Sequence, residues 1–387
     1  MHALALMSTA IFWCGGALIL YTYVMYPVIL WLLAARRVGP SARHLADEQL
    51  PTMSVLIVAH NEQNVIRERI ENLLSLDYPR HKLELAVASD GSRDRTANIV
   101  KEYASAVRLF DYPNNAGKAA ALDAAIPQLT GEIVVLSDAN TMMERRALVQ
   151  LARWFTDART AVVCGKLVLT DPATGLNVDS LYWRYETFLK RCEGRLGGLL
   201  GANGAIYAIR RGLFTGIHPS TIVDDFVIPL LARMNTGCRI VYDESATAYE
   251  ETPSNLEAEF RRRTRIGAGD YQSLGMLWPL MNPFEGWTSF TFISHKVLRW
   301  LCPFFLLGVS AANLFLVRQG GLYIYALLVQ IALYSIALLG HFLSHRSIVG
   351  RVMRLATMFA AMNAALLVGF FRWATARQQA AWERTAR

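Results

Sequence analysis

Acidic and amide side chains follow directly on an apolar stretch in the middle of the sequence. Residues 133–136 (IVVL) are typical of a buried strand, and Ser, Asp, Ala and Asn occupy positions 137–140. Oxygens at positions i and i+2 of an extended segment point the same way, so Asp138 and Asn140 can face one shared object, such as a metal ion and a phosphate. The alternative is that both residues cap a helix that begins near Glu144.

Polar residues also follow two earlier apolar runs. Residues 53–59 (MSVLIVA) are followed by His, Asn and Glu62, and residues 83–89 (LELAVAS) are followed by Asp90, Gly and Ser. Acidic strand ends with a glycine-assisted turn suit a nucleotide whose base and ribose are hydrogen-bonded and whose phosphates are neutralised by a metal. A turn with a helix cap at Asp90, and a solvated helix position for Lys118, are the alternative interpretations.

The segments around these residues alternate between strand and helix. Four apolar runs of strand length end near residues 59, 89, 110 and 136, and helix-like stretches stand between them. This alternation predicts an α/β fold with a mostly parallel sheet covered on both faces, whose ligand lies beyond the carboxyl ends of the strands. No GxGxxG follows the first strand and no GxxxxGK[ST] occurs, which disfavours a dehydrogenase-type dinucleotide fold and a P-loop NTPase.

The composition indicates membrane segments at both ends of the chain. Apolar residues make up 53% and charged residues only 18% of the 387 positions. Ala10–Ala35 carries no charge and is long enough to span a bilayer, with a signal peptide as the alternative. Three apolar stretches near the C-terminus, 298–317, 321–343 and 352–371, are interpreted as transmembrane helices rather than buried core helices.

The net charge of +8 is assigned to membrane topology, and we do not expect nucleic acid as a partner. Arginines flank the apolar stretches, and positive charge marks the cytoplasmic side. We therefore expect a transmembrane anchor over 1–38, a cytoplasmic domain over 39–295 with interfacial helices at its C-terminal end, and transmembrane helices with a basic tail over 296–387. Three crossings would put this tail outside, against the charge bias, unless the apolar region 274–293 changes the count.

The five cysteines are scattered along the chain. They form no CxxC pair and have no metal-binding spacing. This usage is typical of small core or membrane residues in a reducing compartment.

Seven segments of the central region, taken in order, resemble one family. They are VLIVAHNE (55–62), SDGSRDRT (89–96), NNAGKAAALDAAI (114–126), VVLSDAN (134–140), GANGAIYAIRR (201–211), VDDFVIPLLARMNTGCRIVYDESATAYEE (223–251) and RRRTRIGAG (261–269). The set is similar to the membrane-embedded family-2 glycosyltransferases with a glycosyltransferase-A fold, which include hyaluronan, chitin-oligosaccharide, poly-N-acetylglucosamine and cellulose synthases. Each motif alone is weak, but the ordered set is specific.

The resemblance implies a role for each matching residue on the donor side. Asp138 would stand at the start of the family's DxD motif and reach the diphosphate and a Mg²⁺ or Mn²⁺ ion, with Asn140 in place of the second Asp. A neutral amide oxygen is still a ligand that these ions accept. The residues implied to contact the donor are Ala59, Glu62, Asp90, Lys118, Asp138, Arg262 and Arg265.

On the acceptor side, Asp225 in VDDF matches the family's catalytic base. A sugar hydroxyl needs its proton removed as it attacks the anomeric carbon, and one base with a departing nucleotide diphosphate permits a single inverting displacement. A helix cap with a first-turn acid is the alternative explanation of Asp224 and Asp225. The other residues implied on the acceptor side are Gly201, Asn203, Gly204 and Asp224.

The last motif departs from the family's QxxRW. Arg262 stands at the Gln, Arg265 at the Arg and Ile266 at the Trp. Arg265 can bind a diphosphate bidentately, whereas Ile266 offers no aromatic platform for an acceptor sugar. A basic run of this kind also suits acidic lipid headgroups. Processive synthesis and single transfer both stay open at this point.

The resemblance thus implies a multi-pass, inner-membrane, metal-dependent inverting glycosyltransferase with a cytoplasmic catalytic domain. Its donor would be a nucleotide sugar, with uridine as the family's usual nucleoside, and its product an exopolysaccharide or cell-surface glycan made on a saccharide acceptor. Transfer of one sugar to a lipid carrier or other lipid acceptor is the alternative. A membrane transporter that only senses nucleotides is the alternative from another class. Membrane lipid is an expected partner, and an oligomer or export partner could complete a channel.

Overall fold

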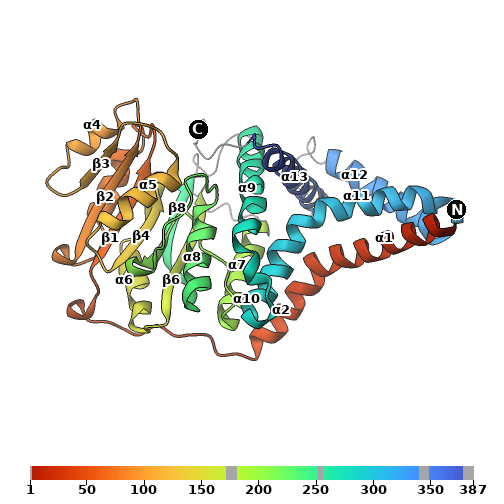
Figure 1. The fold of residues 1–387 in the computed structure, drawn as a ribbon, viewed down its shortest axis with the longest axis horizontal. Coiled ribbons are helices and arrows are strands. Elements are labelled where there is room, and N and C mark those ends of the chain that lie inside the picture. Colours follow the sequence, from red (N-terminus) through yellow and green to blue (C-terminus); the bar gives the residue numbers. More distant parts are fainter. Residues whose placement is uncertain (1, 171–180, 252–255, 340–347, 378–387) are drawn as a thin grey trace. The chain divides into compact units, whose positions relative to one another are not determined.

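The structure of the chain, a computed structural model, describes residues 2–170, 181–251, 256–339 and 348–377. The chain divides into two compact units. The sheet unit comprises Leu30–Ser254 and Gln272–Phe292, and the helical unit comprises Met1–Ile29, Asn255–Tyr271 and Ile293–Gln378. Figure 1 shows the strands of the first unit and the long helices of the second.

An eight-stranded sheet forms the centre of the sheet unit (Figure 1). Its strands are β1 (Met53–Ala59), β2 (Leu83–Asp90), β3 (Arg108–Tyr112), β4 (Ile133–Asp138), β5 (Thr141–Met143), β6 (Thr160–Thr170), β7 (Tyr207–Arg210) and β8 (Arg239–Glu251). They lie in the order β3-β2-β1-β4-β7-β6-β8-β5, with β7 and β5 antiparallel to their neighbours and the remaining pairs parallel. The mostly parallel sheet predicted from the alternating pattern is confirmed.

Helices cover both faces of this sheet. The helices of the sheet unit are α3 (Ile66–Leu74), α4 (Thr96–Lys101), α5 (Lys118–Ala125), α6 (Ala147–Ala152), α7 (Leu181–Leu196), α8 (Asp224–Thr236) and α10 (Trp287–Thr291). α3 and α6 pack on one face, where Ile66, Ile70 and Leu148 join alternate residues of β1 and β4 in the main core. α5 contacts β1 and β2 but contributes nothing to that core, so it covers the other face. Burial of β1 at every position explains its nearly unbroken apolar sequence.

The chain turns after β4 and does not enter the helix predicted near Glu144. Residues 139 and 140 form a turn, β5 follows at once, and α6 begins at Ala147. The reason is a tertiary contact, because β5 adds itself to the edge of the sheet through pairing of Thr141 with Glu250 of β8. Asn140 therefore lies on a turn, where the alternation of an extended strand no longer sets its direction.

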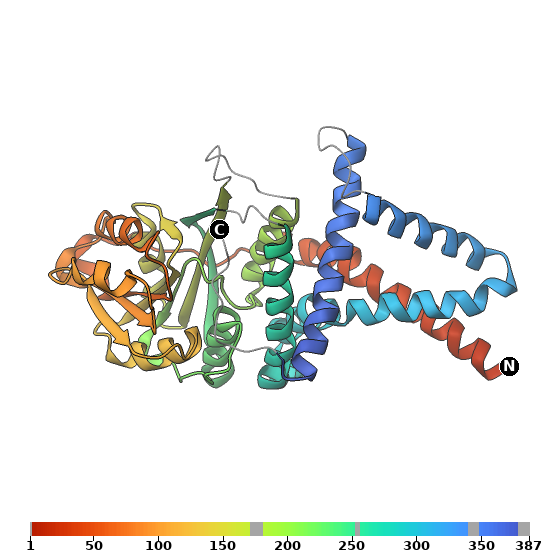
Figure 2. The same cartoon turned by 90° about the horizontal axis from the view of Figure 1, so that it is seen from above.

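Long helices make up the helical unit and the segments leading into it. They are α1 (His2–Leu20), α2 (Tyr26–Ala35), α9 (Leu256–Leu277), α11 (Leu298–Leu316), α12 (Leu322–Leu339) and α13 (Ile348–Ala374). Within this unit α1 packs along α11, and α12 packs against α13 (Figure 2). A Cβ at Gly15 would lie 2.7 Å from Cγ2 of Val309, so the glycine allows a close approach of α1 and α11.

Among the described residues, three helices are long and apolar enough to cross a membrane: His2–Ala35, Trp287–Gln319 and Leu355–Ala374. They cover three of the four predicted spans. The remaining prediction, 321–343, corresponds to the shorter apolar helix Leu322–Leu338, and its last residues, 340–343, lie outside the described residues. The proline-interrupted region before α10 forms two 3₁₀ turns, Trp278–Met281 and Pro283–Glu285.

Candidate active site

Parallel strands bring the predicted strand-end residues to one edge of the sheet. β1 lies between β2 and β4, with Ala59 opposite Ser89 and Val58 opposite Asp138. The residues after Ala59, the end of β2 at Asp90 and the end of β4 at Asp138 therefore share one carboxyl edge. Ala59 itself is fully buried in the main core.

Three loops at this edge are held together by many hydrogen bonds. We name them the loop cluster: residues 60–63, 90–96 and 114–117. The amide of Arg93 donates to Oδ1 of Asn61 over 2.8 Å. The amide of Glu62 donates to Oγ1 of Thr96, also over 2.8 Å. These bonds fix the backbone around the half-buried Glu62, which is the kind of support a binding site needs.

Asp90 is the centre of the loop cluster. Asp90 is 1% exposed, and its two carboxylate oxygens accept from the amides of Ala116 (2.9 Å) and Gly117 (2.8 Å). A Cβ at Gly91 would clash with the backbone of Asn115, so the loop requires a glycine there. Asp90 thus holds the 114–117 loop in position, and its predicted contact with the nucleoside stays a prediction.

Four charged residues form a second group beside these loops. We name them the acid cluster: Lys118, Asp138, Asp224 and Asp225. Nζ of Lys118, the first residue of α5, lies 2.8 Å from Oδ1 of Asp138 and 3.3 Å from Oδ2 of Asp224. Asp224 and Asp225 begin α8, whose N-terminus favours negative charge. Residues far apart in the sequence therefore share one site.

Burial and mutual repulsion set the charges of the acid cluster. Burial and then the neighbouring Asp224 raise the pKa of Asp225 to about 6, and Lys118 opposes this rise. Burial alone would lower the pKa of Lys118, but the carboxylates of Asp138 and Asp224 outweigh it and raise the pKa. Lys118 is therefore an ammonium ion at neutral pH that faces three carboxyl groups. One positive charge does not balance three acids, so a further cation could bind there.

Several polar groups of this site have no hydrogen-bond partner in the described part of the chain. They include Oδ2 of Asp224 and the hydroxyl of Tyr207, both buried. Burial, followed by the charges of the three acids, raises the pKa of the Tyr207 phenol. The carboxylate of Asp225 likewise receives no hydrogen bond from the described residues. Buried oxygens without a hydrogen bond are typical of a site that a substrate completes.

The predicted acceptor-side loop, 201–204, brings backbone close to two of the acids. Gly201 has a φ of +72°, and the next amide, that of Ala202, donates to the carbonyl of Asp225 over 3.0 Å. A Cβ at Gly204 would lie 2.9 Å from Oδ2 of Asp138. The two glycines thus let the loop approach the acid cluster without a side chain in between.

Asn203, in the same loop, has a structural role. The residue is 9% exposed, and its Nδ2 donates to the carbonyl of Gly165 over 2.8 Å. Its Oδ1 accepts from the amide of Ile206 over 3.2 Å. The side chain holds the loop to β6, and its predicted place on the acceptor side stays a prediction.

The two predicted metal ligands have different partners. Nδ2 of Asn140 donates to Oε1 of Glu250 over 3.1 Å, whereas Oδ1 of Asp138 faces Lys118. No group of three or more His, Cys, Asp or Glu side chains that could hold a metal ion occurs in the described residues. Mg²⁺ is commonly bound by one or two carboxylates together with substrate phosphates, so the partly exposed Asp138 fits as a protein ligand for such an ion.

Arg262 and Arg265 belong to α9, in the part of that helix that falls in the helical unit. Arg262 pairs within its own helix with Glu259, at 3.9 Å. Their predicted contact with the donor diphosphate remains a prediction.

Sequence reasoning missed Arg69, which supports the end of β4 from inside the protein. The residue is fully buried, and its Nη2 donates to Oγ of Ser137 over 2.8 Å. Its Nη1 donates to Oδ1 of Asn72, whose amide in turn bonds the backbone of Met143. Burial lowers the pKa of Arg69 to about 9, and Asp138 opposes this. The available signal was an arginine on the apolar face of α3.

Comparison with known proteins finds a family model that matches part of the chain. Residues 54–214 match the model described as Glycosyl transferase family 2. The chain is 28% identical over 239 residues to the probable glycosyltransferase YdaM of Bacillus subtilis, covering 58% of this chain and 56% of the relative. It is 24% identical over 262 residues to the beta-monoglucosyldiacylglycerol synthase of Nostoc sp. (62% and 54%). It is 26% identical over 246 residues to the poly-beta-1,6-N-acetyl-D-glucosamine synthase of Staphylococcus aureus (59% and 56%).

A solved structure shares the fold over nearly the whole chain. It is the mannosyltransferase PcManGT from Pyrobaculum calidifontis in complex with GDP-Man and Mn²⁺. The TM-score is 0.68 at 22% identity, over 96% of this chain and 98% of that chain. The curated relatives are longer, and the chain spans about half of their length. The ordered motifs and the model match agree that residues 54–214 are similar to family-2 glycosyltransferase domains, and the mostly parallel sheet has the predicted glycosyltransferase-A type of fold.

Proposed function

We propose that this chain is a membrane-bound, inverting glycosyltransferase that moves a sugar from a nucleotide-diphosphate donor to a hydroxyl group of a saccharide acceptor. The observation that carries the proposal is the state of Asp225. Its carboxylate stands at the start of α8 beside two other acids, receives no hydrogen bond from the described residues, and has a pKa raised to about 6. A free carboxylate with a raised pKa is suited to remove a proton near neutral pH.

Asp225 would act as the general base of a single displacement. The acceptor hydroxyl gives its proton to the Asp225 carboxylate while its oxygen forms the new bond to the anomeric carbon. The bond from that carbon to the donor diphosphate breaks, and its electron pair leaves with the nucleotide diphosphate. One base and one displacement invert the anomeric centre without a covalent enzyme intermediate.

The rest of the acid cluster would serve the donor diphosphate. Lys118, 2.8 Å from Asp138, would bring positive charge to the leaving phosphates, and its place is fixed by α5. Asp138 would hold a Mg²⁺ or Mn²⁺ ion, which when bound would add charge neutralisation at the diphosphate. The loop cluster, with Glu62 and Asp90, would hold the nucleoside, for which we propose uridine.

The acceptor and the location are also proposals. Three apolar helices support a place in the inner membrane, with the sheet unit on the cytoplasmic side where nucleotide sugars occur. The relatives include one named for a glycan polymer and one named for a glucosyldiacylglycerol. We propose exopolysaccharide or cell-surface glycan synthesis, with a lipid acceptor as the second candidate because of the glucosyldiacylglycerol synthase match.

A panel experiment tests the activity. The full chain, purified in detergent, is incubated with individual nucleotide sugars, Mg²⁺ or Mn²⁺, and either oligosaccharide or diacylglycerol acceptors. We expect release of the nucleotide diphosphate with one or a few donors, loss of release in EDTA, and a product whose size separates polymer from single transfer. The Asp225→Asn protein, prepared in the same way, controls for contaminating hydrolases.

The panel also separates the proposal from a nucleotide-sensing transporter. A sensor needs the residues that bind the nucleotide but no base beside the acceptor. Donor binding by calorimetry without nucleotide diphosphate release, across the whole panel, would contradict the transferase proposal and favour the sensor.

A further inference from the structure

A basic pocket of about 400 Å³ lies in the sheet unit, away from the carboxyl edge of the sheet. Arg159 directly precedes β6 and Arg239 begins β8, and both strands run in the same direction as β4. The pocket therefore stands at the amino ends of these strands, opposite the acid cluster. The residues that line it are Arg159, Leu196, Gly197, Arg233, Gly237, Arg239, Phe284, Glu285, Gly286 and Trp287.

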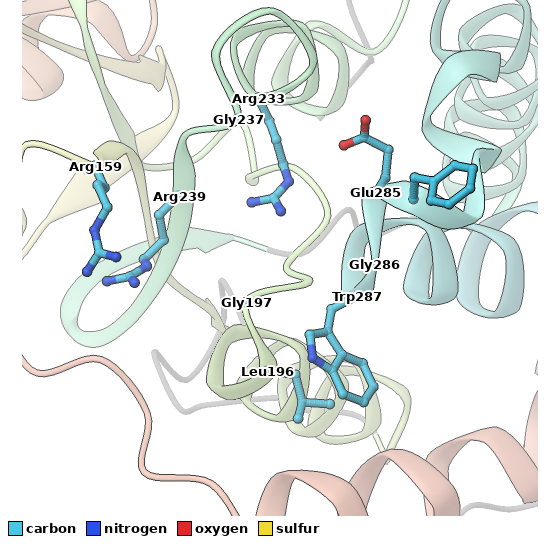
Figure 3. A pocket seen from close by; sticks show the side chains of 10 residues that line it. Arg159, Leu196, Gly197, Arg233, Gly237, Arg239, Glu285, Gly286 and Trp287 are labelled. Carbon is cyan, nitrogen blue, oxygen red and sulfur yellow. The ribbon is translucent and has the colours of Figure 1, made fainter.

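Three arginines line this pocket. Figure 3 shows Arg233 reaching into it from α8, with Arg159 and Arg239 on one side and Glu285 and Trp287 on the other. Nη1 of Arg233 donates to the carbonyl of Cys238 over 2.8 Å, but its Nε is buried and has no hydrogen-bond partner in the described part of the chain. A buried donor of this kind needs an acceptor, and a guanidinium prefers an anionic oxygen.

The acids near the pocket do not neutralise these arginines. Asp157 pairs with Arg239 at 2.9 Å and, less closely, with Arg159 at 3.5 Å. Glu285 is the one acid among the lining residues. Three positive groups against two carboxylates leave a net positive pocket that favours an anion.

The rim of the pocket is aromatic. Phe284, which lines the pocket, is 95% exposed, and Trp278, six residues earlier in the chain and outside the lining, is 63% exposed. Trp287 begins the apolar helix Trp287–Gln319, and the guanidinium of Arg37 lies 5.7 Å from the centre of its indole ring. Exposed tryptophan and arginine side chains together are typical of the level of lipid headgroups.

The two long apolar helices that adjoin the sheet unit in the sequence therefore both have an end near Trp287, which lines the pocket. The helix His2–Ala35 stops two residues before Arg37, and Arg37 lies over Trp287, the first residue of the second helix. If these helices cross a bilayer, their ends mark its surface. A basic pocket at that level meets lipid phosphates in preference to soluble anions.

From this geometry we infer that the pocket binds the phosphate group of one anionic phospholipid. Arg233, with Arg159 and Arg239, binds the phosphate oxygens. Trp287 and Phe284 lie beside the glycerol and the first acyl carbons. The lipid thereby fixes the sheet unit at the membrane surface. The inference rests on this pocket and on the proposed membrane location, and it is independent of the proposed transferase activity.

Lipid binding by the full chain in detergent tests the inference. Native mass spectrometry would follow the complexes formed with phosphatidylglycerol and with phosphatidylcholine of the same acyl chains. We expect one phosphatidylglycerol to bind more tightly than phosphatidylcholine. Arg233→Gln should weaken its binding about fivefold, the effect of about one arginine at a lipid surface. Arg146→Gln, which removes an exposed arginine outside the pocket, is the matched control and should leave binding unchanged.

A second variant guards against a folding defect. Glu285→Gln removes a negative charge from the lining, so phosphatidylglycerol should bind more tightly, a gain that misfolding cannot produce. Three results would overturn the inference: equal retention of both lipids, equal effects of Arg233→Gln and Arg146→Gln, or displacement of the lipid by equimolar inorganic phosphate. The last result would mean that the pocket takes a soluble anion.

Discussion

The loop cluster and the acid cluster adjoin one sheet edge, yet their carboxylates differ in hydrogen bonding. In the loop cluster, Asp90 is buried and accepts two backbone hydrogen bonds, from Ala116 and Gly117. In the acid cluster, Asp225 accepts none from the described residues, and Oδ2 of Asp224 is buried without a hydrogen bond. The first arrangement stabilises the fold, and the second leaves acceptors for a substrate.

The difference has an energetic meaning. A buried polar group without its hydrogen bond costs about 1–3 kcal/mol, and a satisfied one does not. The loop cluster therefore adds to stability while it shapes the proposed donor site. The acid cluster reduces stability, as reactive sites commonly do. Substitutions in the two clusters should accordingly separate activity from stability.

The largest expected effect is the loss of transfer in Asp225→Asn. Removal of a general base lowers turnover about 10²–10⁴-fold, while the affinity for the nucleotide diphosphate should stay within a factor of about two. The variant should melt no lower than the parent, because it removes a buried charge that lacks a hydrogen bond. Nucleotide diphosphate release, calorimetry and thermal melting measure the three quantities. Asp77→Asn, which alters an exposed ion pair with Arg145, is the control and should change none of them.

The second effect concerns the cation that the acids share. Lys118→Gln should lower turnover about 10²–10³-fold, because a fixed positive charge near the leaving phosphates is lost. The ammonium also lowers the pKa of Asp225, so the acid limb of the pH profile should move to higher pH in this variant. Lys118→Arg keeps the charge, so its acid limb should lie at the same pH as in the parent protein. If the acid limb of the pH profile stays at the same pH in Lys118→Gln, Lys118 does not set the pKa of Asp225.

The third effect is on stability and belongs to the loop cluster. Asp90→Ala leaves the amides of Ala116 and Gly117 without acceptors and should reduce the free energy of unfolding by about 1–3 kcal/mol. Asp90→Asn keeps one acceptor oxygen and should lose less. Thermal melting and hydrogen exchange at the two amides follow the change. If Asp90→Ala melts at the same temperature as the parent protein, the loop cluster does not stabilise the fold and the proposed difference between the two clusters is wrong.

Sequence patterns located the elements of the sheet well. β1 matches the predicted run 53–59, and β2 extends its predicted run by one residue, to Asp90. A strand buried on both faces has a continuous apolar sequence with polar residues where it ends, and this signal is local. The ordered motifs then predicted the family, and the family match confirms that prediction.

The contacts inside the site could not be predicted in the same way. Asp90 and Asp225 look alike in the sequence, since each is an acid where a turn or helix begins, and only their surroundings distinguish them. The spacing of Asp138 and Asn140 predicted one shared ligand, but pairing of β5 with β8 puts Asn140 on a turn beside Glu250. The ion pair of Lys118 with Asp224 depends on the topology of the whole sheet unit.

The pH dependence of transfer is the most direct test of Asp225 as the general base. Transfer requires the ionised form of Asp225, whose pKa is raised to about 6, so protonation below that pH removes the base. We expect kcat/KM to be level above pH 7 and to fall below pH 6 by about tenfold per pH unit, with no change in the melting behaviour that would explain the loss. A profile that stays flat from about pH 7 to pH 5 would contradict the assignment of Asp225 as a base with a raised pKa.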